Sequence, residues 1–490
     1  MNTHSLSKST FVRGCNCTKS LYLYKKHSEL ITDIDEKQQA IFDSGHDIGR
    51  LAQELFPNGT DAKPENPSEF PLAVALTRKL MDEGCNIIYE AAFQYDGVLA
   101  ATDILVRDGN NWSAYEVKGS TKVKEEYFSD TALQYYVITN SGRSLKDFSV
   151  IHLNNQYVKR GSLEVEKLFK MTSVKNEVET MQEFVKKKII ELKNIIQLNE
   201  VPKIKIRSYC RDPYECEFID HCWDHIPKEH SVFTLNRIGA SAFEMVEAGI
   251  LTLDQIPTNY KLAKSPAFQL QYFKSGAILI EKKEISDFLG QFLYPLYFFD
   301  FETYMMAVPE FDFSRPYQQI PFQYSLHVLR SENHELEHFE FLGDGFHDPR
   351  AELIKKMIID LGVNGSIITY NSSFEKTRLK ELAEDFPQFA HPIESIINRI
   401  VDLMKPFQSR WYYHPGFEGS YSIKNVLPVL VPDLNYSSME IQEGGTASLV
   451  YSLLRDQDSD TRIVQRKQLL DYCRLDTLAM VEILHVLRKI

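Results

Sequence analysis

Residues 295–308 read PLYFFDFETYMMAV and place two acids, Asp300 and Glu302, inside a run that is otherwise typical of a buried strand. A strand directs alternate side chains to the same face, so the two carboxylates point one way and the aromatic residues beside them point the other. Two unpaired charges this close together are costly in a core unless they share a proton or hold a cation. The stretch therefore predicts a sheet that holds a cation against one face.

The composition is that of a globular protein with several domains. The 490 residues exceed one ordinary core and predict two or three domains, and 43% of them are hydrophobic. No apolar run approaches the roughly 18 residues that a membrane helix needs, and the N-terminus has no apolar signal segment. We therefore expect a cytoplasmic protein without membrane contact. The net charge of −13 argues against a basic coat protein for nucleic acid, but it is compatible with an enzyme whose acids hold metal ions.

Several of the seven cysteines are grouped, and in a cytoplasmic chain such groups favour metal binding over disulfides. Cys210, Cys216 and Cys222 are each separated by five residues, and Cys15 and Cys17 lie near the N-terminus. A fourth ligand for the trio would be Cys17 or Cys15, and Cys17 is favoured because the residues after it begin as a helix would. Zinc and an iron–sulfur cluster both accept four thiolates, so the residues alone leave both open.

A second acidic group is predicted within residues 86–118, which read as three strands with a DGNN hairpin turn between the last two. Glu90 lies on the first strand, Asp103 on the middle strand, and Glu116 and Lys118 share one face of the third. Two carboxylates beside an ammonium group can bind a metal ion and stabilise a developing negative charge.

This strand pattern resembles the PD-(D/E)xK nucleases of the RecB type over about residues 10–225. The helix expected at 130–138 should bring Gln134 and Tyr135 to the same edge. Relatives carry a metal-binding histidine on the first helix, for which His46 is the nearest candidate. The resemblance implies a restriction-endonuclease-like α/β core stapled by a 4Fe–4S cluster, with zinc as the alternative. It implies that Asp103, Glu116 and Glu90 bind metal, and that Lys118 acts in catalysis together with Glu116 and Asp103. Gln134 would contact the substrate. The cluster would be held by Cys17, Cys210, Cys216 and Cys222.

Two further motifs follow the acids at 300 and 302. ITYNSSFEKTRLKEL contains Asn371, Phe374 and Glu375, and LLDYCRLDTLAM contains Tyr472 and Asp476. The last two residues are four apart and therefore share one face of a helix.

Together with Asp300 and Glu302, these motifs resemble the DnaQ-type (DEDDy) exonucleases, although the second motif of that family usually has Asp in place of Glu375. The resemblance implies an RNase H-like mixed sheet with flanking helices and two Mg²⁺ or Mn²⁺ ions roughly 3.5–4 Å apart. It assigns metal binding to Asp300, Glu302, Glu375 and Asp476, orientation of the attacking water to Tyr472, substrate contact to Asn371 and a supporting role to Asp402.

The expected domains are a RecB-like nuclease domain at 1–228, a helical linker at 229–290 and a DEDDy exonuclease domain at 291–490. Residues 160–200 read as helical. Two short helices around Gly249 resemble a helix-hairpin-helix element, and a plain helical linker is an equal interpretation.

The resemblances imply a metal-dependent DNA exonuclease with two sites that act on single-stranded ends and release nucleotides from a 3′ end. Two alternatives stay open: a nucleic-acid-binding protein with one active nuclease domain, and a zinc-stapled RNA-processing exonuclease. The chain has no GxxxxGK[ST] motif, so we expect any unwinding to come from a separate helicase or another subunit of a complex.

Overall fold

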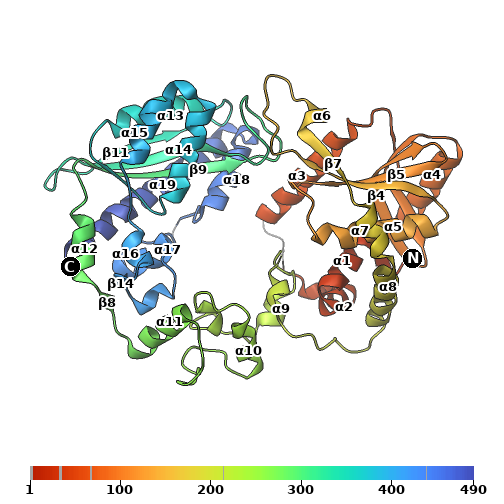
Figure 1. Ribbon diagram of the computed structural model, residues 1–490, viewed down its shortest axis with the longest axis horizontal. Helices are drawn as coiled ribbons and strands as arrows, with labels where there is room; N and C mark the ends of the chain where they lie inside the picture. The colour runs from red at the N-terminus through yellow and green to blue at the C-terminus, as the bar shows by residue number, and fades with distance from the viewer. Residues whose placement is uncertain (1–3, 33–35, 67–68, 213, 438) are drawn as a thin grey trace. The chain divides into compact units, whose positions relative to one another are not determined.

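The computed structural model describes residues 4–32, 36–66, 69–212, 214–437 and 439–490. The chain is an α/β protein that forms two compact units (Figure 1). Unit 1 comprises Met1–His225 and Ala307–Tyr317, and unit 2 comprises Ile226–Met306 and Gln318–Ile490. The segment 229–290, expected as a linker, is thus grouped with unit 2.

Unit 1 is built on a mixed sheet with the order β2-β3-β4-β5-β6-β7, and β1 pairs with the start of β4. The hairpin between β4 and β5 turns at Gly109, whose φ of 63° suits a residue without a side chain. The strands are β1 Leu6–Ser7, β2 Thr60–Asp61, β3 Ile87–Tyr95, β4 Val98–Asp108, β5 Asn111–Lys118, β6 Leu145–Leu153 and β7 Phe169–Ser173.

Helices cover both faces of this sheet because its strands are apolar on both sides. Leu105 and Ala114 share a core with α5, whereas Ile104 and Val117 face the cluster that contains Ile48 of α3. Alternation along β4 and β5 therefore puts Asp103, Glu116 and Lys118 on the α5 face. The helices of unit 1 are α1 Lys8–Asn16, α2 Thr18–Lys26, α3 Glu36–Gln53, α4 Phe70–Asp82, α5 Glu126–Asn140, α6 Val165–Leu168, α7 Lys175–Thr180, α8 Gln182–Ile196 and α9 Ile219–Trp223.

Unit 2 contains a five-stranded sheet with the order β11-β10-β9-β12-β13. β10 runs antiparallel to β9 and to β11, whereas β12 is parallel to β9 and to β13. The strands are β9 Leu296–Met305, β10 Gln319–Leu329, β11 Glu337–Leu342, β12 Ser366–Thr369 and β13 Ile400–Asp402, and β8 Leu279–Ile280 pairs with β14 Tyr412–Tyr413 in a small separate sheet.

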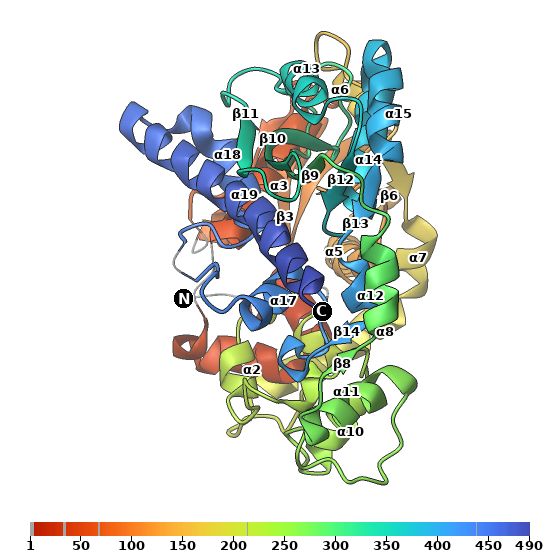
Figure 2. The same ribbon diagram turned by 90° about the vertical axis from the view of Figure 1, so that its left-hand side faces the viewer.

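The two faces of β9 differ as the alternation predicts. Phe299 and Phe301 pack in the core formed with α13, α14 and α15. The long α19 and α18 cover the other face, where Ser325 of β10 bonds to Thr477 (Figure 2). The helices of unit 2 are α10 Ser241–Glu247, α11 Lys264–Ser275, α12 Lys282–Leu289, α13 Arg350–Leu361, α14 Ser373–Asp385, α15 Ala390–Asn398, α16 Lys405–Gln408, α17 Ile423–Leu430, α18 Gly444–Leu453 and α19 Ser459–Arg488.

Two local expectations are wrong. Residues 160–200 are not helical throughout, because β7 pairs with β6 within this stretch. Only one α-helix, α10, adjoins Gly249, and the residues that follow form turns around the bridge between Ser231 and Thr252. The structure therefore contains no helix-hairpin-helix element at this described segment. Within the described residues, no helix combines the length and apolarity needed to cross a bilayer.

Candidate functional sites

Unit 2 contains a cavity of about 460 Å³ at the face of the sheet covered by α18 and α19. The four acids and the tyrosine singled out in the sequence all line it: Asp300, Glu302, Glu375, Asp476 and Tyr472. We call it the acidic cavity. Three local structures supply these side chains: alternate residues of β9, the first turn of α14, and one turn of α19. The structure thus brings together residues that lie up to 176 positions apart (476 − 300).

The carboxylates of the acidic cavity are poorly neutralised. Burial raises the pKa of Glu375 to about 8 and that of Asp476 to about 6, and it raises the pKa of Asp300 and Glu302 well above their ordinary values. Neighbouring acids raise the last two further. Glu375 is 2% exposed, and its Oε2 atom has no hydrogen-bond partner. A buried carboxylate oxygen without a donor is costly, and a bound cation would offset this cost.

Asp300 and Glu302 also place their ligand atoms close to the sulfur of Cys473. Among the described residues, these are the only three candidate metal ligands whose atoms all lie within 4.8 Å of one another. Cys473 is fully buried, and its Sγ lies 4.0 Å from Asp300 Oδ2. The D-x-E pair therefore presents two oxygens to one small volume, as the opening stretch of sequence predicts.

Asp402 supports the loop at the start of α14 rather than lining the cavity. Its two carboxylate oxygens accept hydrogen bonds of 3.0 and 2.9 Å from the backbone N–H groups of Asn371 and Ser372. Asn371 has a positive φ of 74°, a conformation that such bonds stabilise. Asn371 lines the cavity and is otherwise exposed, so its side chain is accessible to a ligand.

Two residues that the sequence analysis missed lie around Asp476. The Tyr436 hydroxyl donates to Asp476 Oδ1, and Lys424 Nζ lies 5.7 Å from the centre of the Tyr436 ring. Lys424 lines the cavity and donates to the carbonyl of Gln442 at 2.6 Å. Neither residue belongs to a recognisable motif, and no sequence signal marks them.

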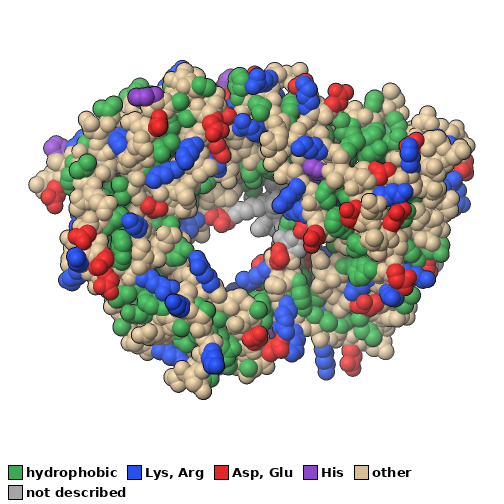
Figure 3. Space-filling model, viewed as in Figure 1, with side chains coloured by type: hydrophobic (Ala, Val, Ile, Leu, Met, Phe, Trp, Pro, Cys, Tyr) green, Lys and Arg blue, Asp and Glu red, His purple; other side chains and the backbone are tan. Residues whose placement is uncertain are grey.

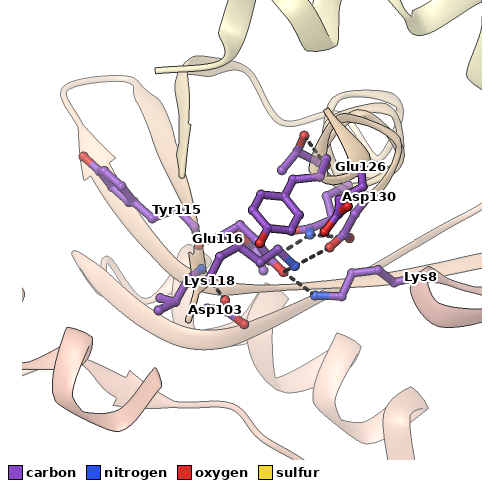
Figure 4. Close-up of polar contacts among 12 residues, drawn as sticks. Lys8, Asp103, Tyr115, Glu116, Lys118, Glu126 and Asp130 are labelled. Atoms are coloured by element: carbon purple, nitrogen blue, oxygen red, sulfur yellow. Dashed lines mark hydrogen bonds and ion pairs between the residues drawn. The ribbon is translucent and has the colours of Figure 1, made fainter. Parts of the chain in front are cut away.

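Unit 1 contains a second group of charged side chains, on the α5 face of its sheet (Figure 4). Lys118 Nζ donates to Glu116 Oε1 at 2.7 Å and to Asp130 Oδ2 at 2.6 Å. Gln134 Nε2 donates to Glu116 Oε2 at 2.8 Å and to Asp130 Oδ1 at 3.0 Å. We call these residues, with Asp103 and Lys8, the lysine–carboxylate cluster. The sequence analysis missed Asp130, although its place one helical turn before Gln134 puts both on one face of α5.

Opposite charges within the cluster stabilise the charged forms of Lys118 and Asp130. Burial opposes the charge on Lys118, but Asp130 and Glu116 raise its pKa well above the ordinary value. Burial alone would raise the pKa of Asp130, and Lys118 and Lys8 instead lower it below its ordinary value. Lys118 and Asp130 are therefore held in their charged forms near neutral pH.

Asp103 lies on β4, the strand beside that of Glu116, and Glu90 lies on β3, one strand further along the sheet; both carry a raised pKa. Burial and then the Glu116 carboxylate raise the pKa of Asp103 to about 7. Its Oδ2 atom accepts a hydrogen bond of 2.6 Å from the Val117 N–H. Burial raises the pKa of Glu90, which has a φ of 51° and interrupts the pairing of β3 with β4. Such strained backbone is common at functional sites.

Lys8 reaches the cluster from the first turn of α1, and no motif in the sequence marks it. Its Nζ lies 2.9 Å from Glu116 Oε1, the oxygen that also accepts from Lys118. Ser7 caps α1, and β1 pairs with β4, which fixes the position from which Lys8 extends. Figure 4 shows the Lys8 and Lys118 side chains meeting at Glu116 from different elements.

The cysteine trio approaches Cys17 and not Cys15. The Sγ atom of Cys17 accepts from the N–H of Ser20, and the Sγ of Cys216 lies 3.7 Å from the Ser20 hydroxyl. Burial raises the pKa of Cys17, and the nearby Cys216 and Cys210 raise it further. Cys15 instead packs against the main core of unit 1, near Lys188 and Glu191 of α8. Arg13 bonds to Glu217 at 2.6 Å and ties α1 to the segment that carries the trio.

The spacing of the sulfurs bears on what they could hold. No three of the cysteine sulfurs in the described part of the chain lie within 4.8 Å of one another. Zn–S bonds of about 2.3 Å in a tetrahedron place sulfurs about 3.8 Å apart. The described sulfurs are therefore spread more widely than the ligands of a tetrahedral zinc site.

Two expected neighbours of the lysine–carboxylate cluster lie elsewhere. His46 is exposed on α3, the helix that packs on the opposite face of the sheet through Ile48. The Tyr135 hydroxyl donates to Glu179 of α7, because adjacent helical residues point about 100° apart and Gln134 takes the inward position. The expectations for both residues are wrong.

Part of unit 2 matches a known sequence family. Residues 297–422 match a family described as a domain of unknown function, DUF2779. The match begins on β9 and includes Glu375 and Asp402, but it ends before Tyr472 and Asp476.

Three curated proteins are similar to parts of the chain, and all three are described as uncharacterized. Protein UU173 of Ureaplasma parvum serovar 3 is 26% identical over 294 residues, which cover 55% of this chain and 41% of that protein. The MG366 homolog of Mycoplasma pneumoniae is 29% identical over 207 residues, and MG366 of Mycoplasma genitalium is 28% identical over 213 residues; each match covers 38% of this chain and 31% of the relative. The chain therefore spans less than half the length of these relatives.

Proposed function

We propose that the protein is a metal-dependent nuclease that hydrolyses phosphodiester bonds, with an exonuclease site of the DEDDy type in unit 2 and a PD-(D/E)xK site in unit 1. One observation carries the proposal: Asp300, Glu302, Glu375, Asp476 and Tyr472 converge on one cavity, where Glu375 Oε2 is buried without a donor. A mixed sheet with helices on both faces is what the resemblance to RNase H-like exonucleases implies, and unit 2 has this form.

The acidic cavity has the chemistry to hold hard cations and a phosphate group together. Carboxylate oxygens are the ligands that Mg²⁺ and Mn²⁺ prefer, and four carboxylate groups line the cavity. Lys424 and the first residues of α18, Gly444 and Gly445, line it as well. An ammonium group and the free N–H groups of a helix N-terminus favour a bound phosphate. Bound ions would neutralise the attacking and leaving oxygens of the phosphodiester, each effect worth several kcal/mol.

Tyr472 is suited to orient the attacking water. Burial and the adjacent carboxylates raise the pKa of its hydroxyl strongly, so the group stays protonated and acts through hydrogen bonds rather than as a base. Tyr472 lies one turn before Asp476 on α19 and lines the same cavity. The helix would hold the hydroxyl beside the acids while the water oxygen forms its bond to phosphorus and the 3′ oxygen leaves.

In unit 1, Asp103 and Glu116 would hold a divalent ion, with Glu90 beside them, and Lys118 would stabilise the charge that develops on the phosphate. Gln134 orients Glu116 and so acts on the site through that carboxylate. Cys17, Cys210, Cys216 and Cys222 would hold a 4Fe–4S cluster that ties the N-terminal helices to the end of unit 1.

The substrate proposed is single-stranded DNA with a free 3′ end. On the face drawn in Figure 3, basic and acidic side chains are interspersed, so a strand would be held mainly at the acidic cavity and the lysine–carboxylate cluster rather than by a broad basic surface on that face. A separate helicase or another subunit would supply duplex unwinding.

A cleavage assay with matched variants tests the proposal. The full chain, purified without oxygen, is incubated with 3′-labelled and 5′-labelled single strands of DNA and of RNA in Mn²⁺. We expect loss of mononucleotides from the 3′ end, no reaction in EDTA, and strongly reduced trimming by Asp300→Ala. Lys118→Arg in the Asp300→Ala background should remove the remaining cleavage. Trimming of 3′ ends that persists in this double variant would refute the assignment of both sites.

A further inference from the structure

Two ammonium groups share one oxygen of the lysine–carboxylate cluster. Lys8 Nζ and Lys118 Nζ lie 2.9 and 2.7 Å from Glu116 Oε1, although Glu116 is only 2% exposed (Figure 4). Lys118 has a second carboxylate partner at hydrogen-bond distance, Asp130, whereas the only carboxylate at this distance from Lys8 among the described residues is Glu116. Lys8 is therefore a cation directed at the proposed metal ligand itself.

The hydrogen bonds leave little room for metal ions on Glu116. An ionised carboxylate has about four acceptor positions. Two positions on Oε1 are taken by the ammonium groups, and one on Oε2 is taken by Gln134 Nε2 at 2.8 Å. One position remains, and Asp103 is the neighbouring acid that can share an ion there. The Val117 N–H already occupies one position of Asp103.

We propose that Lys8 is a built-in cation that takes the place of a second metal ion, so that the site of unit 1 uses a single divalent ion. This inference rests on the proposed nuclease function and concerns the number of ions at that site. Geometry supports it: the Lys8 ammonium lies 2.9 Å from the same Glu116 oxygen that binds Lys118. The Lys8 ammonium is placed directly against Glu116, where a second ion would otherwise bind. The acidic cavity of unit 2, in contrast, has four carboxylates and no such lysine–carboxylate pair among its described residues.

Counting bound Mn²⁺ tests the proposal without reliance on cleavage. The full chain carries Asp300→Asn and Glu302→Gln to disable the acidic cavity, and free Mn²⁺ is measured by electron paramagnetic resonance at saturation. The same chain with Asp103→Asn added serves as the reference, and the ions lost on this addition are those bound in unit 1. We expect one such ion per chain with Lys8 present and one with Lys8→Arg. With Lys8→Met we expect two ions per chain in unit 1, because Glu116 Oε1 regains an acceptor position and its negative charge loses one compensating cation.

A matched control is Lys193→Met, which removes a lysine of similar exposure that pairs with Asp96 on the same unit. The side chains of Lys193 and Lys8 are 24% and 30% exposed. We expect one ion in this variant. Two ions per chain with Lys8 present, no ion in unit 1, or an unchanged count in a folded Lys8→Met chain would each overturn the proposal. If Lys8→Met does not fold, the ion counts of the unaltered site and of Lys8→Arg still test the proposal: one ion in each supports it, and two ions or none with Lys8 present overturn it.

The same preparations separate this inference from the proposed function. An ion count of one together with no cleavage by any preparation would refute the nuclease and leave the single-ion site standing. Cleavage that requires Lys118, together with two ions in the unaltered site, would refute the role of Lys8 and leave the nuclease standing.

Discussion

The Tyr436 hydroxyl donates a hydrogen bond of 2.6 Å to Asp476 Oδ1 at the acidic cavity of unit 2. Tyr472 lies one helical turn before Asp476 on α19. Two tyrosines therefore flank one proposed metal ligand, and they differ in position: Tyr472 lines the cavity, whereas Tyr436 approaches from the segment before α18. We therefore propose that Tyr472 orients the attacking water and that Tyr436 orients the ligand Asp476.

Replacing each tyrosine by Phe should separate these roles. Tyr436→Phe should raise the Mn²⁺ concentration needed for half-maximal 3′ trimming about 10–100-fold, because a ligand loses its supporting hydrogen bond. The maximal rate at saturating Mn²⁺ should change little. Tyr472→Phe should lower that maximal rate about 100-fold, the lower end of the contributions found for groups that assist proton transfer. Metal titrations of both variants measure the difference. A dead Tyr436→Phe at saturating Mn²⁺ would reverse the assignment.

The buried Glu375 should make metal-free unit 2 less stable as the pH rises. Its pKa is raised from 4.5 to about 8, so between these values the folded state binds more protons than the unfolded state. Stability therefore falls with increasing pH across this window. Glu375→Gln should raise the Tm in EDTA at pH 8 more than at pH 5, and a change of 1 kcal/mol corresponds to about 2–4 °C. Thermal melts of the full chain at both pH values measure this.

Two controls accompany the Glu375→Gln melts. Glu384→Gln, an exposed position on the same helix, should leave the Tm unchanged at both pH values. Mg²⁺ should raise the Tm of the unaltered chain at pH 8 more than that of Glu375→Gln. Equal effects of Glu375→Gln at pH 5 and pH 8 would contradict the raised pKa.

Lys118 should be needed for both stability and cleavage. Lys118→Met leaves the buried carboxylates of Glu116 and Asp130 without this partner and should destabilise unit 1 by about 3 kcal/mol. Lys118→Arg keeps the charge and should recover most of this loss, but its planar guanidinium should not restore cleavage. Urea unfolding and cleavage, both in the Asp300→Ala background, measure the two effects. Full cleavage by a folded Lys118→Met chain would exclude a catalytic role.

Cys17 and Cys15 form a matched pair for testing the cluster. Cys17→Ser should lower the iron content and the visible absorbance of protein purified without oxygen, because its sulfur lies with the trio. Cys15→Ser should retain both, since that thiol packs in the core near α8. Stoichiometric zinc without iron in the unaltered protein would exclude the cluster. Equal iron loss in the two variants would contradict the choice of Cys17.

Local periodicity accounts for the parts of both sites that could be predicted. The alternation of β9 places Asp300 and Glu302 on one face, and a helical turn places Tyr472 beside Asp476. The hairpin of β4 and β5 follows from its turn residues and brings Asp103 near Glu116. These relationships depend on neighbours within a few residues or on one tight turn. The sequence by itself therefore determines which side chains share a face.

Only the tertiary structure decides which other elements come to those faces. Lys8 meets Glu116 across 108 residues, and Tyr436 meets Asp476 across 40. Cys17 joins the trio because of the way α1 and α2 pack, while Cys15, two residues earlier, turns into the core. Such contacts arise from the packing of whole helices against a sheet, which optimises total buried surface rather than any one pair. No local pattern in the chain encodes them, so the cations that neutralise each carboxylate become visible only in the folded protein.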